Sequence, residues 1–292
     1  MIRISDEVRE ADAVVALETT IVAHGFPAGE GVAVGLESEQ RVREAGAVPA
    51  TIGVLDGEIR VGLTVAELER FDSAARKAGP RELAGCVARS QVGATTVGGT
   101  LAVCRAAGIR LMGTGGIGGV HRGDRFDVSA DLLQLSRSQV VVVSSGVKSL
   151  LDVQATAEML ETLGVPVLGW GTNTMPRFYD ARGGPPVTER VELVDEAVRL
   201  ATLHWELGGC GVLLARPPDE SIDVDDLIEV TLAEAERDGI RGQAVTPFVL
   251  SRLHERSGGR TLAANRELAA ANAGLAGQLA VSLARGPAAS TG

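Results

Sequence analysis

Residues 139–152 read QVVVVSSGVKSLLD, and this stretch decides the fold class. Four consecutive valines are typical of a strand that is buried on both faces of a parallel sheet. The glycine at position 146 allows a sharp turn, and residues 149–164 are predicted to form the helix that follows. Ligands bind at the carboxyl ends of the strands in open α/β sheets, so we expect Lys148 to lie at a ligand-binding edge.

Six other apolar runs that end at turn residues predict further strands. They cover residues 13–17, 49–55, 58–63, 108–113, 165–170 and 210–215. Helical patterns separate most of the runs, which predicts a three-layer α/β/α fold with a mixed, mostly parallel central sheet. Asp56 and Gly57 stand between two of the runs and predict a hairpin, which makes one strand pair antiparallel. Thr64 followed by Glu67 predicts a capping box at the start of a helix.

The C-terminal part of the sequence is helical. Helical patterns cover residues 224–239, 246–258 and 261–283, and they predict a helical cover over the sheet. We find no linker, so we expect a single domain over residues 1–292. The last residues, from about 285 to 292, are expected to be a disordered tail.

The chain carries a formal net charge of −10, and no basic stripe is interleaved with aromatic residues. We therefore expect a small-molecule substrate rather than a nucleic-acid polymer. The N-terminus has no apolar signal segment, and no apolar stretch approaches the ~20 residues of a membrane span. We expect no association with a membrane and a cytoplasmic location.

Lysine is unusually rare in this chain. Only two of the 28 lysine and arginine residues are lysines, Lys77 and Lys148. One interpretation is a compositional bias that removed lysines at random. The other is that arginine replaced lysine only where charge sufficed, because a guanidinium stays protonated and cannot form an imine. Composition alone does not separate the two interpretations.

Lys148 itself has two interpretations. An amine in a largely apolar pocket at the end of a strand becomes a nucleophile toward an aldehyde or a sugar anomeric carbon. The alternative is a lysine that binds phosphate or forms an ion pair. Lys77, in the polar stretch AARKAGPRE, is more typical of a surface residue or a phosphate contact.

Glu18 follows the first of these apolar runs, in the stretch LETTIVAHGFP at residues 17–27. It is either a solvated strand end or an acid in a pocket. Thr19, Thr20 and His24 are close enough in sequence to hydrogen-bond it. Partial burial would raise the pKa of this carboxyl toward values useful for proton donation.

Six glycines fall within GTGGIGGVHRG at residues 113–123, directly after a predicted strand. Glycine-rich loops let backbone N–H groups converge on an anion, and we favour a site for an anion or a sugar. The spacing differs from the dinucleotide-binding pattern, because His121 and Arg122 follow in place of a helix. The alternative is a tight crossing of loops without a ligand.

Oxygen-bearing side chains alternate in FDVSADL at residues 126–132. Ser129 or Asp131 would cap the following helix, which is the simpler interpretation. Alternating oxygen ligands, with Asp127 among them, also suit a hard divalent cation that keeps several waters.

Eight motifs follow one another between about residues 11 and 284. They are ALETTIVAHGFP, VPATIGVLDGEIRVGLT, GATTVGGTL, GTGGIGGVHRG, FDVSADL, SSGVKSLLD, GVPVLGWGTNTMPRFY and VTPFVLSRL. This series resembles the pseudouridine-5'-phosphate glycosidase family, which includes indigoidine-cluster relatives. The resemblance covers nearly the whole chain, and it places both lysines on functional positions of the family.

The resemblance implies a role for each matched position. Glu18 falls on the acid that protonates the departing base, Lys148 on the nucleophile and Asp127 on the ligand of a divalent ion, Mn²⁺ in this family. The implied substrate contacts are Lys77, Val97, His121, Ser129, Ala130, Asp131 and Asn272. The resemblance also implies a homotrimer.

The implied reaction makes or breaks a carbon–carbon bond between C1 of ribose 5-phosphate and C5 of uracil. A C-glycoside cannot leave with its electrons on nitrogen, as an N-glycoside does. An iminium between C1 and a lysine provides an electron sink, and a carboxylic acid then delivers a proton to the carbon of the base.

The chain departs from the family pattern at several positions. Residues 79–84 read GPRELA where the family tends to have SRRDLP, and the loop between His121 and Asp127 is about two residues shorter. Arg216 and Ala271 replace common asparagines. We expect these changes to cluster around the base pocket, so one alternative is a C-glycosynthase that attaches ribose 5-phosphate to an aromatic natural-product acceptor. A further alternative is a non-catalytic sugar-phosphate sensor, which would need no lysine nucleophile.

Overall fold

The computed structural model describes residues 1–123, 126–241 and 245–286. Its strands are β1 (Ile2–Ile4), β2 (Val14–Glu18), β3 (Val48–Leu55), β4 (Glu58–Val61), β5 (Arg76–Ala78), β6 (Gly93–Thr95), β7 (Leu111–Gly113), β8 (Val120–His121), β9 (Val141–Ser144), β10 (Leu151–Asp152), β11 (Val167–Trp170), β12 (Glu189–Val191) and β13 (Val212–Ala215). Its helices are α1 (Asp6–Glu10), α2 (Thr20–His24), α3 (Gly31–Glu44), α4 (Val65–Leu68), α5 (Leu83–Ala88), α6 (Val97–Ala107), α7 (Ala130–Leu135), α8 (Val153–Thr162), α9 (Val194–Glu206), α10 (Asp225–Arg237), α11 (Val245–Arg256) and α12 (Arg260–Arg285). The seven predicted strands are all present.

The central sheet is mixed and mostly parallel, as predicted. Its main path runs β1-β4-β3-β2-β7-β9-β13-β11-β12, and β6 pairs with both β3 and β5. The predicted hairpin joins β3 to antiparallel β4, with positive φ values of 52° at Asp56 and 78° at Gly57. The capping box of Thr64 and Glu67 is also present, at the start of α4.

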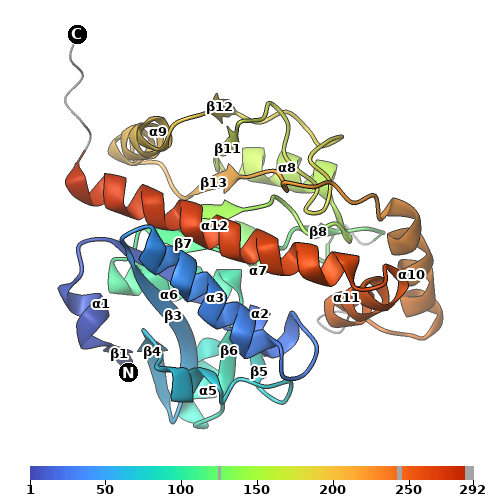
Figure 1. Ribbon diagram of the computed structural model, residues 1–292, viewed down its shortest axis with the longest axis horizontal. Helices are drawn as coiled ribbons and strands as arrows, with labels where there is room; N and C mark the ends of the chain where they lie inside the picture. The colour runs from blue at the N-terminus through green and yellow to red at the C-terminus, as the bar shows by residue number, and fades with distance from the viewer. Residues whose placement is uncertain (124–125, 242–244, 287–292) are drawn as a thin grey trace.

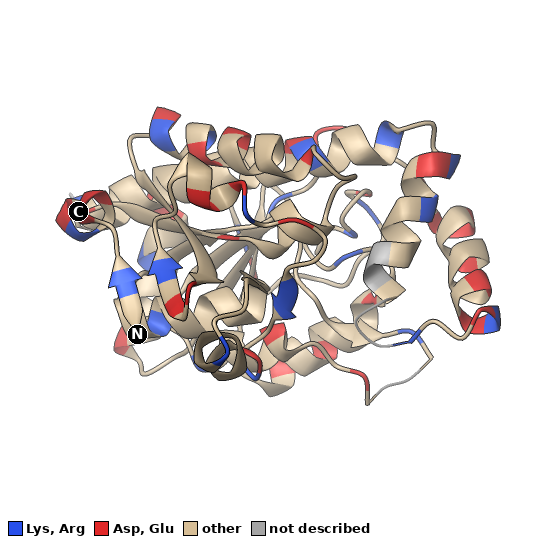
Figure 2. Ribbon diagram, turned by 90° about the horizontal axis from the view of Figure 1, so that it is seen from below, with Lys and Arg blue, Asp and Glu red and all other residues tan. Residues whose placement is uncertain are grey.

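Helices cover both faces of the sheet, which confirms the three-layer fold (Figure 1). In β9, Val141 and Val143 pack with residues of α9 and α12, whereas Val142 faces the opposite way and packs with residues of α6 and α7. This alternation explains the run of valines, because each face of the strand meets a helical layer. Lys and Arg residues are interspersed with Asp and Glu along the outer helices (Figure 2).

The C-terminal helices do more than cover the sheet. Helix α12 crosses one face of the sheet beside α3, while α10 and α11 lie at one end of the molecule (Figure 1). A Cβ atom added at Gly113 would lie 2.8 Å from the Cα of Ala273, so the end of β7 passes directly against α12.

None of the helices in the described part of the chain has the length and apolar character to cross a membrane. The expected tail beyond residue 286 lies outside the described residues.

The helix after the valine run begins later than predicted. Leu151 and Asp152 form β10, which pairs antiparallel with β8, so they are not available to a helix. The Asp152 side chain then accepts a hydrogen bond from the Ala155 N–H and caps α8, which starts at Val153. Lys148 therefore stands in a loop, residues 145–150, which we call the lysine loop.

Candidate active site

Three neighbouring parallel strands, β2, β7 and β9, end at the same edge of the sheet. Strand β2 ends at Glu18, and β7 continues into residues 114–119, which we call the glycine loop. Strand β9 continues into the lysine loop. The topology therefore brings the predicted acid, the glycine-rich segment and the predicted nucleophile to one edge, where ligands bind in α/β sheets.

Backbone hydrogen bonds join the glycine loop to the lysine loop. The Ile117 N–H donates to the Gly146 carbonyl at 3.0 Å, and the Lys148 N–H donates to the Ile117 carbonyl at 3.1 Å. Gly146 has a φ of +80°, and a Cβ there would lie 2.1 Å from the Pro176 carbonyl oxygen. A positive φ and the lack of room for a Cβ atom both require glycine, which explains the glycine two residues before Lys148.

Buried threonines attach β6 and its neighbours to the end of β2. The hydroxyls of Thr19 and Thr95 both donate to the Ile52 carbonyl, at 2.8 and 2.7 Å, and the Thr95 N–H donates to the Thr19 hydroxyl. Because β6 pairs with β5, this network also fixes Lys77, which lies on β5. Lys77 therefore lies at the same site, although it comes from a different part of the sheet.

Glu18 is a buried acid whose side chain is held by the glycine loop. It is 5% exposed, and its Oε1 accepts a hydrogen bond from the Thr114 hydroxyl at 2.6 Å. Burial raises the pKa of Glu18, against the opposing effects of Lys148, Thr114 and Lys77. A carboxyl with a raised pKa keeps its proton to higher pH, which suits a general acid.

The prediction that Thr19, Thr20 and His24 hydrogen-bond Glu18 is wrong. Thr19 is engaged with Ile52, the Thr20 hydroxyl donates to the Ala94 carbonyl at 3.1 Å, and His24 Nε2 lies 3.0 Å from the Ala75 carbonyl. All three side chains are thus engaged with backbone carbonyls instead. The actual partner, Thr114, is distant in sequence.

A pocket of about 460 Å³ opens beside the acid, and we call it the polar pocket. The predicted site residues that line it are Glu18, Lys77, Val97, His121, Asp127, Ser129, Ala130, Asp131 and Lys148. Helix α6 begins at Val97 on this wall, and the N-terminal end of a helix attracts anions. Burial lowers the pKa of Lys77, and the neighbouring Lys148 lowers it further.

A second and smaller pocket adjoins the first, and we call it the apolar pocket. Its lining comes from Glu18, Thr20, Ile21, His24, Gly25, Lys77, Thr114, Gly115, Gly116, Lys148, Phe178, Leu250 and Asn265. Phe178 has a strained φ of +64°, and its ring lies so close to Gly116 that a Cβ there would be 2.5 Å away. Glu18, Thr20, Lys77 and Lys148 line both pockets and form the wall between them.

Asn265 was not singled out from the sequence. It is only 4% exposed and lines the apolar pocket, and its side chain makes no hydrogen bond to the described residues. A buried amide without a protein partner is costly unless a ligand or water satisfies it. Asn265 lies seven residues before Asn272 on α12, and this helical spacing was the available signal.

Asn272 lies behind the glycine loop and lines neither pocket. It is fully buried, and its Nδ2 donates to the Thr114 carbonyl at 2.8 Å and to the Ser145 hydroxyl at 3.1 Å. It therefore ties α12 to both loops. The structure does not bring it together with the other predicted substrate contacts.

Ser129 and Asp131 have structural partners as well as positions on the polar pocket. Ser129 is the N-cap of α7 and accepts a hydrogen bond from the Asp131 N–H, which confirms the capping interpretation. The Asp131 carboxylate accepts hydrogen bonds from the N–H groups of Gly98 and Gly118, at 2.7 and 2.8 Å. This carboxylate joins the start of α6 to the glycine loop.

Asp127 stands at the outer rim of the polar pocket. Its side chain is 44% exposed, and its Oδ2 lies 3.8 Å from His121 Nδ1. Across residues 1–123, 126–241 and 245–286, no three His, Cys, Asp or Glu side chains are grouped to hold a metal ion. The structure thus places one half-exposed carboxylate beside one imidazole where the ion was expected, and the divalent cation stays a prediction.

The departures from the family pattern do not gather at one place. Gly79 and Pro80 line the polar pocket rather than the apolar one. Arg216 lines neither pocket and pairs with Asp219 at 2.6 Å. The shortened loop includes residues 124 and 125, which lie outside the described part of the chain.

Comparisons with known proteins show the family of the chain. The family model described as "Indigoidine synthase A like protein" matches residues 3–282. A pseudouridine-5'-phosphate glycosidase from Myxococcus xanthus is 46% identical, over 97% of this chain and 99% of the relative. Another with that name, from Nocardioides, is 45% identical over 95% of this chain and 94% of the relative.

Two solved structures share the fold, each at 40% identity and covering 98% of this chain and 97% of the other. One is the prealnumycin C-glycosynthase AlnA in complex with ribulose 5-phosphate, with a TM-score of 0.88. The other is an indigoidine synthase A-like protein from Thermotoga maritima, with a TM-score of 0.90. The chain thus belongs to the indigoidine synthase A-like family and is an enzyme of the pseudouridine-5'-phosphate glycosidase type.

Proposed function

We propose that this enzyme reversibly cleaves pseudouridine 5'-phosphate to uracil and ribose 5-phosphate. The observation that carries the proposal is the shared wall, where the buried acid Glu18 and the amine of Lys148 face both pockets. A C-glycosidic bond needs an electron sink on the sugar and a proton donor for the base. The names of the curated relatives support the same substrate.

The two pockets suit the two halves of the substrate. The sugar phosphate occupies the polar pocket, where Lys77 and the N-terminal end of α6 at Val97 attract the phosphate. Uracil occupies the apolar pocket against Phe178, where the Asn265 amide pairs with an amide edge of the ring. The small size of this pocket favours a single ring over a polycyclic acceptor.

Cleavage begins with bond formation at C1 of the sugar. The Lys148 amine adds to C1, the C1–O4 bond breaks, and O4 takes the proton that the amine releases. The C1–C5 bond then breaks, its electron pair goes to C5 of the base, and C5 takes the proton of Glu18. The nitrogen lone pair of Lys148 forms a C1=N iminium, which water hydrolyses to the open-chain aldehyde, and the released proton returns to Glu18.

We include a divalent cation, Mn²⁺ or a similar ion, in the proposal. Asp127 would hold it, and His121 lies beside that carboxylate. Such an ion supplies positive charge and polarised water to bound substrate oxygens. The expected homotrimer and the cytoplasmic location are further proposals, and light scattering on purified protein tests the first of them.

The decisive experiment is an assay in the synthetic direction with ribose 5-phosphate, Mn²⁺ and a panel of acceptors. We expect uracil to be joined at C5 and a three-ring aromatic acceptor to be refused. The similarity to AlnA favours the second candidate, a C-glycosynthase for aromatic acceptors. Turnover of the aromatic acceptor without turnover of uracil would establish that candidate, and no turnover of either in both directions would favour the non-catalytic sensor.

A further inference from the structure

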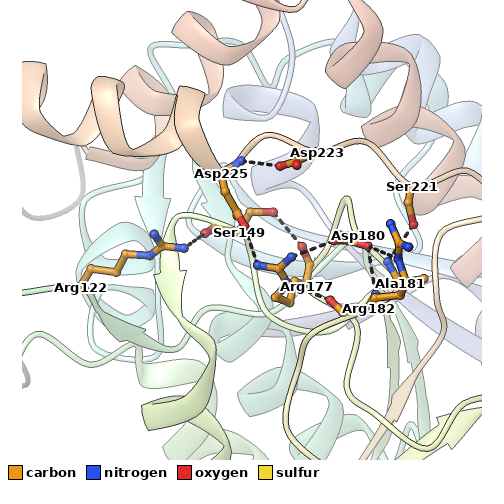
Figure 3. Close-up of polar contacts among 9 residues, drawn as sticks. All are labelled: Arg122, Ser149, Arg177, Asp180, Ala181, Arg182, Ser221, Asp223 and Asp225. Atoms are coloured by element: carbon orange, nitrogen blue, oxygen red, sulfur yellow. Dashed lines mark hydrogen bonds and ion pairs between the residues drawn. The ribbon is translucent and has the colours of Figure 1, made fainter.

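Two arginines hold the lysine loop at Ser149, and neither of them lines the polar or the apolar pocket (Figure 3). Arg122 Nη2 donates to the Ser149 carbonyl at 2.9 Å, and its Nε donates to the Leu151 carbonyl at 3.2 Å. Arg122 follows β8, which pairs with β10, so the strand pairing itself brings the guanidinium to these carbonyls. The Arg122 side chain thus binds two carbonyls of the backbone that follows Lys148, those of Ser149 and Leu151.

The second arginine, Arg177, contacts the Ser149 side chain with its backbone carbonyl. The Ser149 hydroxyl donates to the Arg177 carbonyl at 2.9 Å. The Arg177 guanidinium is paired with Asp180 and Asp225, both at 2.8 Å, which anchors this segment to the start of α10 (Figure 3). Ser149 is therefore held between Arg122 on its carbonyl and Arg177 on its hydroxyl.

The two sides of Lys148 are fixed in different ways. The residues before it are held by backbone bonds to the glycine loop, such as the Ile117 N–H to the Gly146 carbonyl. The residue after it, Ser149, is held by hydrogen bonds to Arg122 and Arg177. We propose that Arg122 is a positioning residue, which sets the direction of the Lys148 amine toward the sugar carbon by holding the backbone at Ser149 and Leu151.

Arginine has a specific advantage in this position. Its planar guanidinium offers several N–H donors in a fixed fork, so it can hold two carbonyls at a defined separation, whereas a lysine is a single flexible point. His121, the preceding residue, lines the polar pocket, while Arg122 does not. A direct contact of Arg122 with substrate is therefore not part of the proposal.

The inference rests on the proposed role of Lys148 as nucleophile, and the test keeps the two apart. Full-length protein is mixed with ribose 5-phosphate and borohydride, and the rate of adduct formation on Lys148 is followed by mass spectrometry. If the unsubstituted protein forms no adduct, the proposed function fails. If it does, the variants below decide the role of Arg122.

We expect Arg122→Ala to slow adduct formation by about 10- to 100-fold, since small displacements of a reacting group cost rates of this order. The KM for ribose 5-phosphate should stay within about twofold, because no substrate contact is lost. Arg122→Lys should recover only part of the rate. Arg110→Ala is the matched control, because Arg110 also donates to a loop carbonyl, that of Gln139, but far from the lysine loop.

Two results would overturn the inference. One is an unchanged adduct rate in a folded Arg122→Ala variant, and the other is a raised KM with an unchanged rate at saturation, which would make Arg122 a substrate contact. If Arg122→Ala does not fold, the Arg122→Lys variant decides, because a lysine does not hold both carbonyls in the fixed fork of a guanidinium. A rate reduced about 2- to 10-fold in Arg122→Lys supports the inference, since one hydrogen bond contributes in this range, and an unchanged rate refutes it.

Discussion

The polar pocket and the apolar pocket share one wall but are built from different parts of the molecule. The polar pocket is formed by charged and backbone groups that come mainly from the first half of the chain, such as Lys77, the start of α6 and Asp131. The apolar pocket receives side chains from distant segments, including Phe178, Leu250 on α11 and Asn265 on α12. The proposed function thus assigns the sugar phosphate to fixed elements of the sheet edge, and the base to a few side chains of the C-terminal part.

This difference has a consequence for specificity. Substitutions at Leu250 or Asn265 would change the apolar pocket without removing a hydrogen bond of the two loops, whereas Phe178 also contacts both loops through its N–H to Ser145 and its ring against Gly116. The C-terminal helices are therefore the place where a change of aglycone is easiest. The departures at Gly79 and Pro80 lie instead on the polar pocket, which the proposed function assigns to the sugar phosphate.

The largest effect is expected at the shared wall. Lys148→Arg keeps the charge but cannot form an imine, so it should abolish both catalysis and the borohydride-trapped adduct with ribose 5-phosphate. Mass spectrometry of the tryptic peptide measures the adduct, and Lys77→Arg serves as the matched control because Lys77 lines the same wall. A pentose phosphate found on Lys77 would reverse the assignment of the two lysines.

The sequence predicted this wall well because both residues follow recognisable strands. Glu18 and Lys148 each lie at the end of an apolar run, and parallel strands place such ends together. The short strands β5 and β6 were missed, since three residues carry no clear periodicity. Asn265 was missed because a helical pattern shows that two positions share a face, but only packing shows which of them reaches a pocket.

The next largest effect concerns the proton donor. Glu18→Gln should slow release of the base by roughly 10²–10⁴-fold, the usual range for a positioned general acid, while adduct formation with ribose 5-phosphate stays measurable. Because burial raises the pKa of Glu18, cleavage by the unsubstituted enzyme should fall as the pH rises through that raised value. Rapid-quench measurements separate the two steps, and an equal loss of both would mean that Glu18 has another role.

A pair of substitutions tests the division between the pockets directly. Lys77→Met should raise the KM for ribose 5-phosphate by about 10- to 100-fold, since it removes a charged hydrogen-bond donor. Asn265→Leu should raise the KM for uracil by about 2- to 10-fold, the range for a neutral hydrogen bond. Steady-state kinetics with each substrate varied in turn measures both, and the division fails if either variant raises the two KM values equally.

A smaller effect is expected at the rim of the polar pocket. Asp127→Ala should weaken Mn²⁺ binding by about 10-fold or more, because it removes the carboxylate that the proposal assigns to the ion. Electron paramagnetic resonance of free Mn²⁺ measures the affinity directly, without an activity assay. Asp219→Ala is the control, because Asp219 pairs with Arg216 outside both pockets, and equal affinities in the two variants would remove Asp127 from the proposal.

The smallest effect is on stability, and it follows from the burial of the acid. The pKa of Glu18 is raised above its ordinary value of 4.5 in the folded state, so the folded protein binds this proton more tightly than the unfolded chain does. The resulting stability is present below the ordinary pKa and is lost as the pH rises through the raised one. Glu18→Gln cannot ionise, so its Tm should exceed that of the unsubstituted protein at pH 8 by about 2 °C, on the order of 1 kcal/mol for a chain of this size, and by less at pH 5. Glu39, whose pKa burial also raises, should show the same sign in Glu39→Gln but no loss of catalysis. A Tm difference for Glu18→Gln that does not change with pH would mean that the pKa of Glu18 is not raised in the folded protein.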